Sequence, residues 1–447
     1  MTRLHTPGAV RWICRTLEEA GHEAWAVGGA VRDRLAGRSS GDWDLTTSAR
    51  PQELRRLFRR TVPVGVEHGT VGILARDGTM YEVTTFRRDV ETSGRHAVVA
   101  FADSLDEDLA RRDFTINAIA WHPLREVLHD PWGGEADLRE GRLRTVGAPA
   151  ERFAEDYLRV LRALRFAGGF RLEIDPESWR ALTAAVPGMT ILSAERVREE
   201  LDKVLESSRP SASLGLYGAS GALGFLFPEL TPLLKRDGRR PGPWTLNLLS
   251  LDLLSARRSS LRWAALLAGI GRPEGGFDGT EGGVDPFRRA LLRSAALLRR
   301  LRSSNARIEE VATLVARIDA APSPDLAEPE LRRVLSDVGR GALPSLLRLW
   351  GARARVLDRI HGEDTRTRVH VRRARRLRGL ARAQLPLAIE ELAIGGRDLI
   401  RAGHSPGPHF GELLRHLLDR VIEEPELNER ERLLEIAEGW MEAHDAR

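Results

Sequence analysis

The chain of 447 residues contains a single cysteine, Cys14, and therefore forms no internal disulfide bond. No apolar run approaches the roughly 18 residues that a membrane-spanning helix needs, and the N-terminal residues lack the apolar core of a signal peptide. These absences argue against a disulfide-stabilised secreted domain and against a membrane protein. We therefore expect a cytoplasmic protein, with Cys14 in a helix core beside Trp12 and Ile13.

Lysine is also nearly absent, since Lys203 and Lys235 are the only two, and arginine supplies the rest of a net charge of +5. Arginine binds phosphate in a bidentate manner and stacks on bases, which would suit an RNA partner. A bias this complete is also typical of a GC-rich genome. The charge therefore permits an RNA partner without requiring one.

The composition, 42% hydrophobic and 30% charged, is that of a globular protein with two to four domains. We predict an α+β protein: an α/β head with a mixed sheet, followed by an all-α neck, body and tail. The predicted ranges are 1–148 for the head, 149–230 for the neck, 231–325 for the body and 326–447 for the tail. In the head we expect helices at 7–20, 30–35 and 48–60 and strands at 24–27, 41–47, 68–75 and 80–86.

Two carboxylates, Asp42 and Asp44, lie one residue apart in the β-type run 41–47. Side chains alternate along a strand, so both carboxylates would share one face while Trp43 and Leu45 enter the core. Adjacent carboxylates repel each other unless a cation lies between them, and oxygen ligands suit Mg²⁺. A surface Asp-x-Asp in a turn is the alternative. Glu82, on a neighbouring strand, is either a third carboxylate of this site or a solvent-facing residue.

A glycine pair precedes the carboxylates. Gly28 and Gly29 separate a predicted strand from a predicted helix that carries Arg32. A strand, a glycine pair and a helix start together bring backbone N–H groups to an anion, although a tight turn explains a glycine pair equally well. A phosphate cradle followed by a carboxylate pair resembles the polymerase-beta-like nucleotidyltransferases. Within them, the pattern resembles the bacterial class II tRNA CCA-adding enzyme and poly(A) polymerase family.

The resemblance extends to further motifs later in the chain. The run 111–118, Arg-Arg-Asp-Phe-Thr-Ile-Asn-Ala, matches a family signature completely. The resemblance implies that Arg112 binds the triphosphate together with Gly28, Gly29 and Arg32 of the earlier motif, and that Asp113 and Asn117 position the ribose. The run 191–201 matches the last motif and predicts a helix, capped by Ser193, that supports the nucleotide pocket.

The run 155–167 reads as one amphipathic helix in which Asp156 and Arg159 are neighbours at i, i+3. An ordinary ion pair is one interpretation. The resemblance instead implies the family's nucleotide-selecting motif, Glu-Asp-x-x-Arg-x-x-Arg. A carboxylate accepts from the exocyclic amine of cytosine or adenine, and an arginine donates to the ring acceptors beside it, whereas uracil and guanine present a carbonyl instead. Arg162 and Arg165 would hold phosphates or the same base.

The C-terminal half resembles the family less specifically. The run 244–273 resembles the HD phosphohydrolase pattern, but Trp244, Ala268 and Gly269 stand where that pattern needs histidines and an aspartate. We therefore predict a degenerate HD domain that is retained for packing. Arginine-rich helices at 288–302 and 331–382 and the glycine-rich turns at 391–414 suggest a tRNA-binding tail, although any single arginine is more simply a solvated surface residue.

The resemblance implies an enzyme that adds C, C and A to tRNA 3′ ends from CTP and ATP, releasing pyrophosphate. Two Mg²⁺ ions would be held by Asp42 and Asp44, with Glu82 as the candidate third carboxylate. Relatives that add only A, add only CC, or make poly(A) share nearly all of these motifs. The run 87–100 reads as a mobile loop and favours a protein able to add A, but its Gly94-Arg95-His96-Ala97 departs from the commoner form. An RNA-binding protein on an inactive transferase head is the non-enzymatic alternative, and the intact motifs argue against it.

Overall fold

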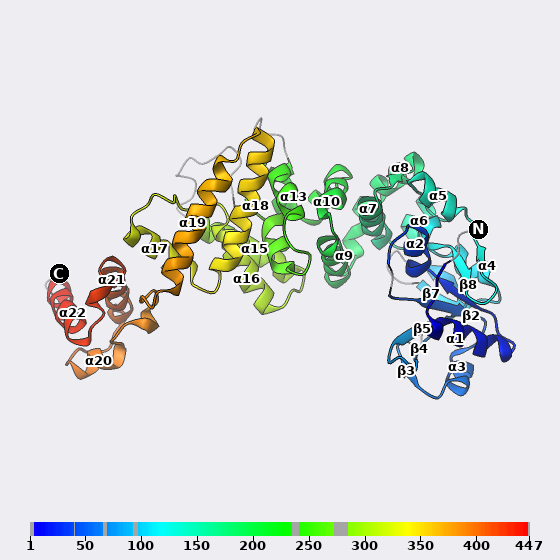
Figure 1. The fold of residues 1–447 in the computed structure, drawn as a ribbon, viewed down its shortest axis with the longest axis horizontal. Coiled ribbons are helices and arrows are strands. Elements are labelled where there is room, and N and C mark those ends of the chain that lie inside the picture. The colour runs from blue at the N-terminus through cyan, green and yellow to red at the C-terminus, as the bar shows by residue number, and fades with distance from the viewer. Residues whose placement is uncertain are drawn as a thin grey trace. The chain divides into compact units, whose positions relative to one another are not determined.

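The computed structural model describes residues 4–39, 41–65, 69–92, 97–234, 241–271 and 285–445. It divides into two compact units, Met1–Thr231 and Pro232–Arg447. The N-terminal unit contains a mixed sheet and the C-terminal unit is helical, as the predicted α+β class requires (Figure 1). The predicted end of the neck at residue 230 lies beside this division, and the finer division into four domains stays a prediction.

A seven-stranded sheet forms the framework of the N-terminal unit, in the order β3-β4-β5-β2-β1-β8-β9. Only the β2–β5 pair is parallel among the pairs in this sheet, so the mixed sheet is confirmed. The strands are β1 (Ala24–Val27), β2 (Asp44–Thr47), β3 (Thr61–Pro63), β4 (Thr70–Leu74), β5 (Met80–Thr85), β8 (Ala120–His122) and β9 (Val127–His129).

Helices pack on this sheet and continue into the neck. The helices before the neck are α1 (Gly8–Glu19), α2 (Gly29–Leu35), α3 (Pro51–Leu57), α4 (Leu105–Ala110), η2 (Thr115–Asn117) and α5 (Gly134–Glu140). In the range predicted as the neck, the helices are α6 (Pro149–Glu155), α7 (Leu158–Phe170), α8 (Pro176–Ala185), η3 (Val186–Ile191), α9 (Ala194–Glu206), α10 (Pro210–Ala219), α11 (Ala222–Leu226) and η4 (Pro228–Leu230). Two-residue strands β10 (Arg142–Leu143) and β11 (Glu173–Ile174) pair in parallel, so the region after residue 149 is not purely helical.

The apolar stripe of α1 fills the core against the sheet, and it includes Cys14. Burial and the charge of Glu18 raise the pKa of the Cys14 thiol to about 12. The thiol is therefore protonated and inaccessible, which confirms Cys14 as a core residue rather than a nucleophile. Trp43 and Leu45 are buried in the same core, as the alternation around the two aspartates predicts.

Three predicted boundaries in the head are corrected by the structure. The strand that carries the carboxylates begins at Asp44 and does not include Asp42, and the helix predicted from residue 48 begins at Pro51. Ser48 lies outside that helix because its hydroxyl accepts a hydrogen bond from the Glu23 amide, 2.9 Å away. The run 87–100 is a hairpin rather than an irregular loop, formed by β6 (Arg87–Thr92) and β7 (Ala97–Phe101). Gly94, Arg95 and His96 lie outside the described residues.

The helix predicted over 155–167 is in fact two helices. α6 ends at Glu155, and α7 begins at Leu158. Between them Asp156 has an extended backbone, with φ −152° and ψ 107°. Apolar periodicity does not reveal this break, because the break lies before the apolar residues of the run. Leu161 and Leu164 are at helical spacing within α7 and are buried there.

The C-terminal unit is helical throughout its described residues (Figure 1). Its helices are α12 (Thr231–Leu234), α13 (Pro243–Asp252), α14 (Ser259–Leu266), α15 (Pro286–Arg300), α16 (Asn305–Arg317), α17 (Glu328–Val338), α18 (Leu343–His361), α19 (Thr365–Arg382), η5 (Ile389–Glu391), α20 (Gly396–Arg401), α21 (His409–Glu423), η6 (Pro425–Leu427) and α22 (Arg430–Asp445). The arginine-rich segments at 288–302 and 331–382 are helical, as predicted. Trp244 lies on α13, and the degenerate HD domain stays a prediction.

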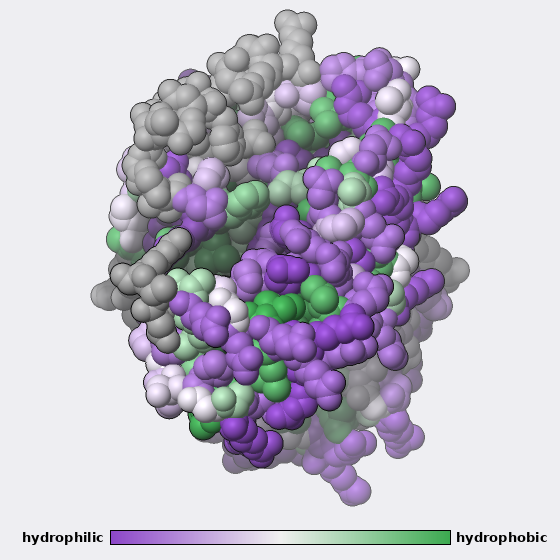
Figure 2. Space-filling view, turned by 90° about the vertical axis from the view of Figure 1, so that its left-hand side faces the viewer, coloured by the Kyte–Doolittle hydropathy of each residue, from purple (hydrophilic) through white to green (hydrophobic). Residues whose placement is uncertain are grey.

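The face of the molecule shown in Figure 2 is mainly hydrophilic, with apolar side chains confined to small patches.

A buried apolar cluster, which includes Leu399, Leu413, Leu417 and Leu433, holds α20, α21 and α22 together. None of the helices in the described ranges is both long and apolar enough to cross a membrane.

Candidate nucleotide-binding site

A cavity of about 580 Å³ opens in the N-terminal unit. It is lined by strands of the sheet, by the start of α2, and by α4, α7 and α9. Twelve of the predicted site residues line it: Gly28, Gly29, Arg32, Asp44, Glu82, Arg112, Asp113, Asn117, Asp156, Arg159, Arg162 and Arg165. Asp42 does not line the cavity, and its side chain is exposed immediately before β2.

Acidic residues mark the sheet side of the cavity. In the parallel pair β2–β5, Leu45 is opposite Val83, so Asp44 and Glu82 lie side by side on the opposite face. Burial, followed by the charges of Asp42 and Glu82, raises the pKa of Asp44 to about 6, while Arg112 lowers it. Asp42 is therefore close enough to affect Asp44 although it does not line the cavity. The repulsion among these three carboxylates favours a bound cation.

Gly28 lies where the strand turns into α2. Its φ is +72°, a conformation that side chains rarely adopt. A Cβ there would lie 3.2 Å from Arg112 Nη1 and 3.9 Å from Asp44 Oδ2. The missing side chain therefore leaves room for an arginine beside the carboxylate.

Gly28→Ala is expected to raise the nucleotide KM roughly 5- to 10-fold, because Arg112 must shift by a few tenths of an ångström. Gly37→Ala is the matched control: its φ is +69°, but a Cβ there would meet no atom within 4 Å. Both variants should lose about 1 kcal/mol of stability in thermal unfolding. Equal KM values for the two variants would show that the space beside Arg112 does not matter.

Asp108 was not predicted as a site residue, yet it holds the arginine pair of the signature run. This carboxylate is 1% exposed and accepts hydrogen bonds from Arg112 Nη2 at 3.1 Å and from Arg111 Nη2 at 3.1 Å. Among the described residues, the Nε of Arg112 is buried with no hydrogen-bond partner. An aspartate in a short helix, three and four residues before two arginines at the C-terminal end of that helix, is the signal that would have revealed this role.

A buried polar chain links α2 to α7 through the residues assigned to the ribose. Arg32 Nη1 donates to Asn117 Oδ1 at 2.6 Å, and Asn117 Nδ2 donates to Asp113 Oδ1 at 2.9 Å. Arg162 Nε then donates to Asp113 Oδ2 at 2.8 Å. Burial alone would raise the pKa of Asp113, but the charge of Arg162 and the bond from Asn117 lower it to about 2. Asp113 is therefore ionised and orients both of its partners.

Asp156 and Arg159 both line the cavity, but they pair with other residues. Asp156 Oδ2 accepts from Arg196 Nη2 at 2.6 Å, and Asp156 Oδ1 accepts from the Leu158 amide at 3.0 Å. Arg159 forms an ion pair with Glu155 and donates to backbone carbonyls of Arg152 and Arg111. An ordinary Asp156–Arg159 ion pair is therefore not what the motif forms.

The helix predicted over 191–201 is α9, and Ser193 caps it as expected by accepting from the Arg196 amide. Besides Arg196 it supplies Glu200, which is 1% exposed and accepts from Arg165 Nε at 2.6 Å. Arg162 approaches the other oxygen of Glu200 at 3.7 Å. α9 thus supplies one charged partner to Asp156 and one to the arginines of α7, all in the run that the resemblance links to nucleotide selection.

This arrangement of fold and cavity defines the head of a nucleotidyltransferase. Family models agree: the poly A polymerase head domain matches residues 24–144, "Probable RNA and SrmB- binding site of polymerase A" matches 169–234, and tRNA nucleotidyltransferase domain 2 matches 292–437. The CCA-adding enzyme of Geobacillus kaustophilus is 36% identical over 430 residues, 94% of each chain. That of Geobacillus stearothermophilus is 32% identical over 428 residues, again 94% of each. The chain therefore belongs to the CCA-adding enzyme family of tRNA nucleotidyltransferases.

A solved structure supports the same conclusion over nearly the whole chain. The crystal structure of the Bacillus stearothermophilus CCA-adding enzyme in complex with CTP has a TM-score of 0.72 and 29% identity, and it covers 99% of this chain and 100% of its own. Nucleotidyltransferases of this kind generally use a divalent metal. The carboxylates Asp44, Glu82 and Asp42 fit this use in their charge and oxygen donors. In the described part of the chain, no three or more His, Cys, Asp or Glu side chains form a group that could hold a metal ion.

Proposed function

We propose that this protein adds C, C and A in turn to tRNA 3′ ends from CTP and ATP, without a nucleic-acid template. The observation that carries the proposal is one cavity in which two carboxylates of the sheet, Asp44 and Glu82, face the arginines of the signature run and the base-selecting pair Asp156 and Arg159. The family relation supports it, and the similar crystallised enzyme is described as a complex with CTP.

In the proposed reaction the terminal 3′-hydroxyl of tRNA loses its proton to solvent, and its oxygen forms a bond to the α-phosphorus of the nucleotide. The bond from that phosphorus to the bridging oxygen of the β-phosphate breaks, and pyrophosphate leaves with the electron pair. Arg32 and Arg112 bind the triphosphate, while Gly28 and Gly29 leave room for it. Asp113 and Asn117 hold the ribose edge. The contribution of these residues is positioning and charge stabilisation.

We assign Mg²⁺ to Asp42 and Asp44, with Glu82 as a third carboxylate. Mg²⁺ usually binds one or two carboxylates and completes its shell with substrate phosphates and water, so a small donor set suffices. When bound, the metal lowers the pKa of the attacking hydroxyl and neutralises the leaving pyrophosphate. Asp44, whose pKa is about 6, is mostly ionised at neutral pH and is available as a ligand.

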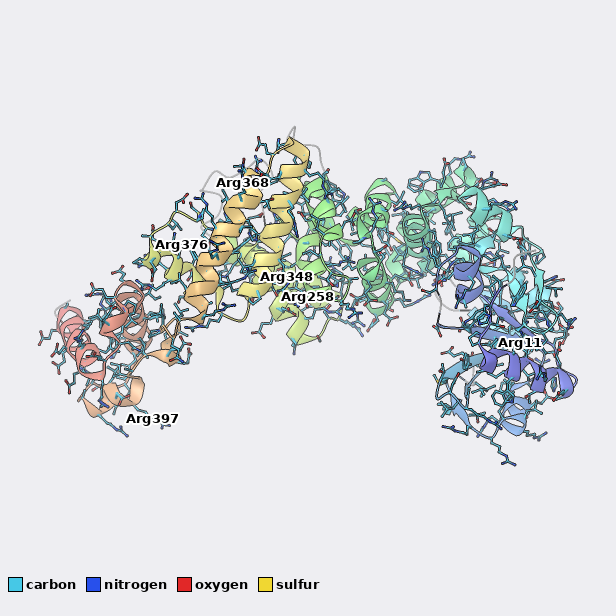
Figure 3. The ribbon with its side chains drawn as sticks, in the orientation of Figure 1. Arg11, Arg258, Arg348, Arg368, Arg376 and Arg397 are labelled. Carbon is cyan, nitrogen blue, oxygen red and sulfur yellow. The ribbon has the colours of Figure 1, made fainter. Side chains whose placement is uncertain are left out.

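An exposed row of arginines on α19 supports a tRNA contact in the C-terminal unit. Its members recur at helical spacing: Arg368, Arg372, Arg375, Arg378 and Arg382. Figure 3 labels one member of this row, Arg368, on α19. Arg368 also pairs with Asp364 at 2.5 Å, so this surface is not uniformly available. Sequence-independent phosphate contacts would suit an enzyme that accepts every tRNA.

We propose the cytoplasm as the site of the reaction, which a single buried thiol fits. The two rival activities closest to the proposal are addition of A alone and addition of CC alone, since the same site would serve each. Poly(A) synthesis and RNA binding without catalysis are the others.

The test uses purified protein, Mg²⁺ and three tRNA transcripts that end at the discriminator base, at C or at CC. Each is incubated with CTP and ATP, separately and together, and the products are sized on a gel. We expect all three to grow to one common CCA end. Extension of only the CC-ended transcript would establish an A-adding enzyme, arrest at CC a CC-adding enzyme, and long A tails a poly(A) polymerase.

Two controls complete the assay. A transcript that already ends in CCA should not grow, and a reaction with chelator should give no product. Absence of extension from all three transcripts, with tRNA still bound in a gel-shift assay, would instead support the non-catalytic RNA-binding alternative.

A further inference from the structure

Two phenylalanines on α7, Phe166 and Phe170, lie one turn apart where the neck meets the head. Their ring centroids are 6.3 Å apart, and Phe114 of the signature run packs edge-on against Phe166 at 5.8 Å. Phe166 is 5% exposed and lines the cavity. We call Phe166 and Phe170 the phenylalanine platform.

Four arginines stack on this platform, two from each side of the site. From the head, the Arg32 guanidinium lies 4.8 Å from the Phe166 centroid and 4.5 Å from that of Phe170, and Arg38 lies 3.9 Å from Phe170.

From the neck, Arg165 and Arg162 lie 4.2 and 5.2 Å from the Phe166 centroid. One ring, Phe166, therefore carries an arginine assigned to the triphosphate and two arginines of the base-selecting motif.

The Phe166 ring lies among three guanidinium groups of like charge. Burial and, more weakly, the charge of Arg165 lower the pKa of Arg32, while the charge of Asp33 and its hydrogen bond with Arg32 raise it. An aromatic face attracts a cation, and a guanidinium stacked on it uses none of its N–H groups in that contact. The N–H groups in the plane of the Arg32 guanidinium therefore bond to oxygen acceptors. Nη1 donates to Asn117 Oδ1 at 2.6 Å, and Nη2 donates to Asp33 Oδ1 at 2.6 Å.

The platform also joins the two sides directly. Arg38 Nη2 donates to the Gly169 carbonyl at 2.8 Å while its guanidinium covers Phe170. The segment after α2 is thereby fixed to the last turn of α7, and the position of Arg32 in the head depends on rings that belong to the neck.

We propose that Phe166 and Phe170 are positioning residues of the nucleotide site, which hold the triphosphate-binding arginine of the head in register with the base-selecting arginines of the neck. The proposal rests on the proposed nucleotidyltransferase function. The platform touches arginine side chains rather than reacting atoms, so its loss should weaken nucleotide binding more than it slows the chemical step.

The test compares Phe166→Leu and Phe170→Leu, which keep an apolar side chain and remove the aromatic face. Phe166→Leu is expected to raise KM for CTP and for ATP roughly 5- to 30-fold, because three cation–π contacts are lost, with kcat within about threefold of wild type. Phe170→Leu removes two such contacts and should raise KM less. Phe170→Tyr keeps the ring of the half-buried residue and should restore KM to within about twofold of wild type.

Phe153→Leu is the matched control. This phenylalanine of α6 is buried in the same unit, and no cation–π contact that the structure describes involves it. It should lower the melting temperature about as much as Phe166→Leu and leave KM unchanged. Unchanged KM in both platform variants, or an equal rise in Phe153→Leu, would overturn the proposal.

Calorimetric titration of CTP into each protein without tRNA separates the two hypotheses. Weaker CTP binding in Phe166→Leu, with unchanged binding in Phe153→Leu, supports the platform even if wild-type protein extends no transcript, in which case only the proposed reaction fails. Equal CTP affinity in wild type and Phe166→Leu refutes the platform even if wild-type protein extends tRNA.

Discussion

Asp44→Asn is expected to reduce nucleotide incorporation on the order of a thousandfold or more and, at the same time, to stabilise the protein in metal-free buffer at neutral pH. The first effect follows from the loss of a carboxylate that we assign to the metal. The second follows from the site itself, because burial and the neighbouring charges of Asp42 and Glu82 raise the pKa of Asp44 to about 6.

The sign of the stability effect is fixed by that shift. The pKa of Asp44 rises from 3.8 to about 6 on folding, so the folded protein binds the proton more tightly than the unfolded chain. Stability is therefore lost as pH rises from about 4 through 6. Asparagine does not ionise, so the variant avoids a penalty on the order of 1–2 kcal/mol after allowance for solvent screening.

Thermal unfolding with chelator at pH 7.5 and at pH 4.5 measures this directly. The advantage of Asp44→Asn over wild type should be largest at pH 7.5 and small at pH 4.5, while added Mg²⁺ should stabilise wild type only. Asp103→Asn is a control in which the carboxylate is 96% exposed and outside the cavity. Retained turnover, or a variant less stable than wild type at both pH values, would contradict the assignment of Asp44.

Local sequence signals were sufficient for the elements that surround the carboxylates. β1 matches its predicted range, and α1 and α2 begin within one residue of theirs, because glycine, proline and apolar spacing act over a few residues. β5 likewise ends one residue early. These elements alone place Gly28, Arg32 and Asp44 near one another, which explains why the head of the site was predictable.

The break at Asp156 was not predictable in this way. Its extended backbone is accompanied by an ion pair with Arg196, which lies 40 residues later in the chain on α9. A long-range contact of this kind leaves no trace in the apolar spacing, because the apolar residues that predicted one helix, at 158, 161, 164 and 166, all lie within α7. The hairpin β6–β7 was missed for a related reason, since its sequence does not alternate as a half-buried strand does.

The residues that support the site were missed most often. Asp108, Glu200 and Phe166 contact arginines of the site, and each would read as an ordinary helix residue. A motif identifies the groups that touch the ligand. Only the structure shows which buried carboxylate or ring holds those groups in place.

Asp156→Asn is expected to lower kcat/KM for CTP and ATP about a hundredfold and to reduce the preference for CTP over UTP by a similar factor. Both oxygens of Asp156 already accept N–H donors, from Leu158 at 3.0 Å and from Arg196 at 2.6 Å. In asparagine one acceptor becomes an NH₂ group. The amide oxygen will remain with the charged Arg196, so the NH₂ group replaces the oxygen beside Leu158.

The base then meets a donor where the carboxylate offered an acceptor. The exocyclic amines of cytosine and adenine lose their partner, whereas the carbonyl of uracil or guanine gains one. Single-nucleotide extension of a tRNA that ends at the discriminator base, with each of the four nucleotides in turn, measures the change. UTP incorporation should rise relative to CTP even though total activity falls.

Asp175→Asn is the matched control for this substitution. Its carboxylate also accepts backbone amides at a helix start, from Glu177 at 3.1 Å and Ser178 at 3.2 Å, but it does not line the cavity. It should lose stability without changing nucleotide preference. If Asp156→Asn merely slows all four nucleotides equally, Asp156 orients Arg196 and α7, and base selection must reside in Arg159 and the arginines beside it.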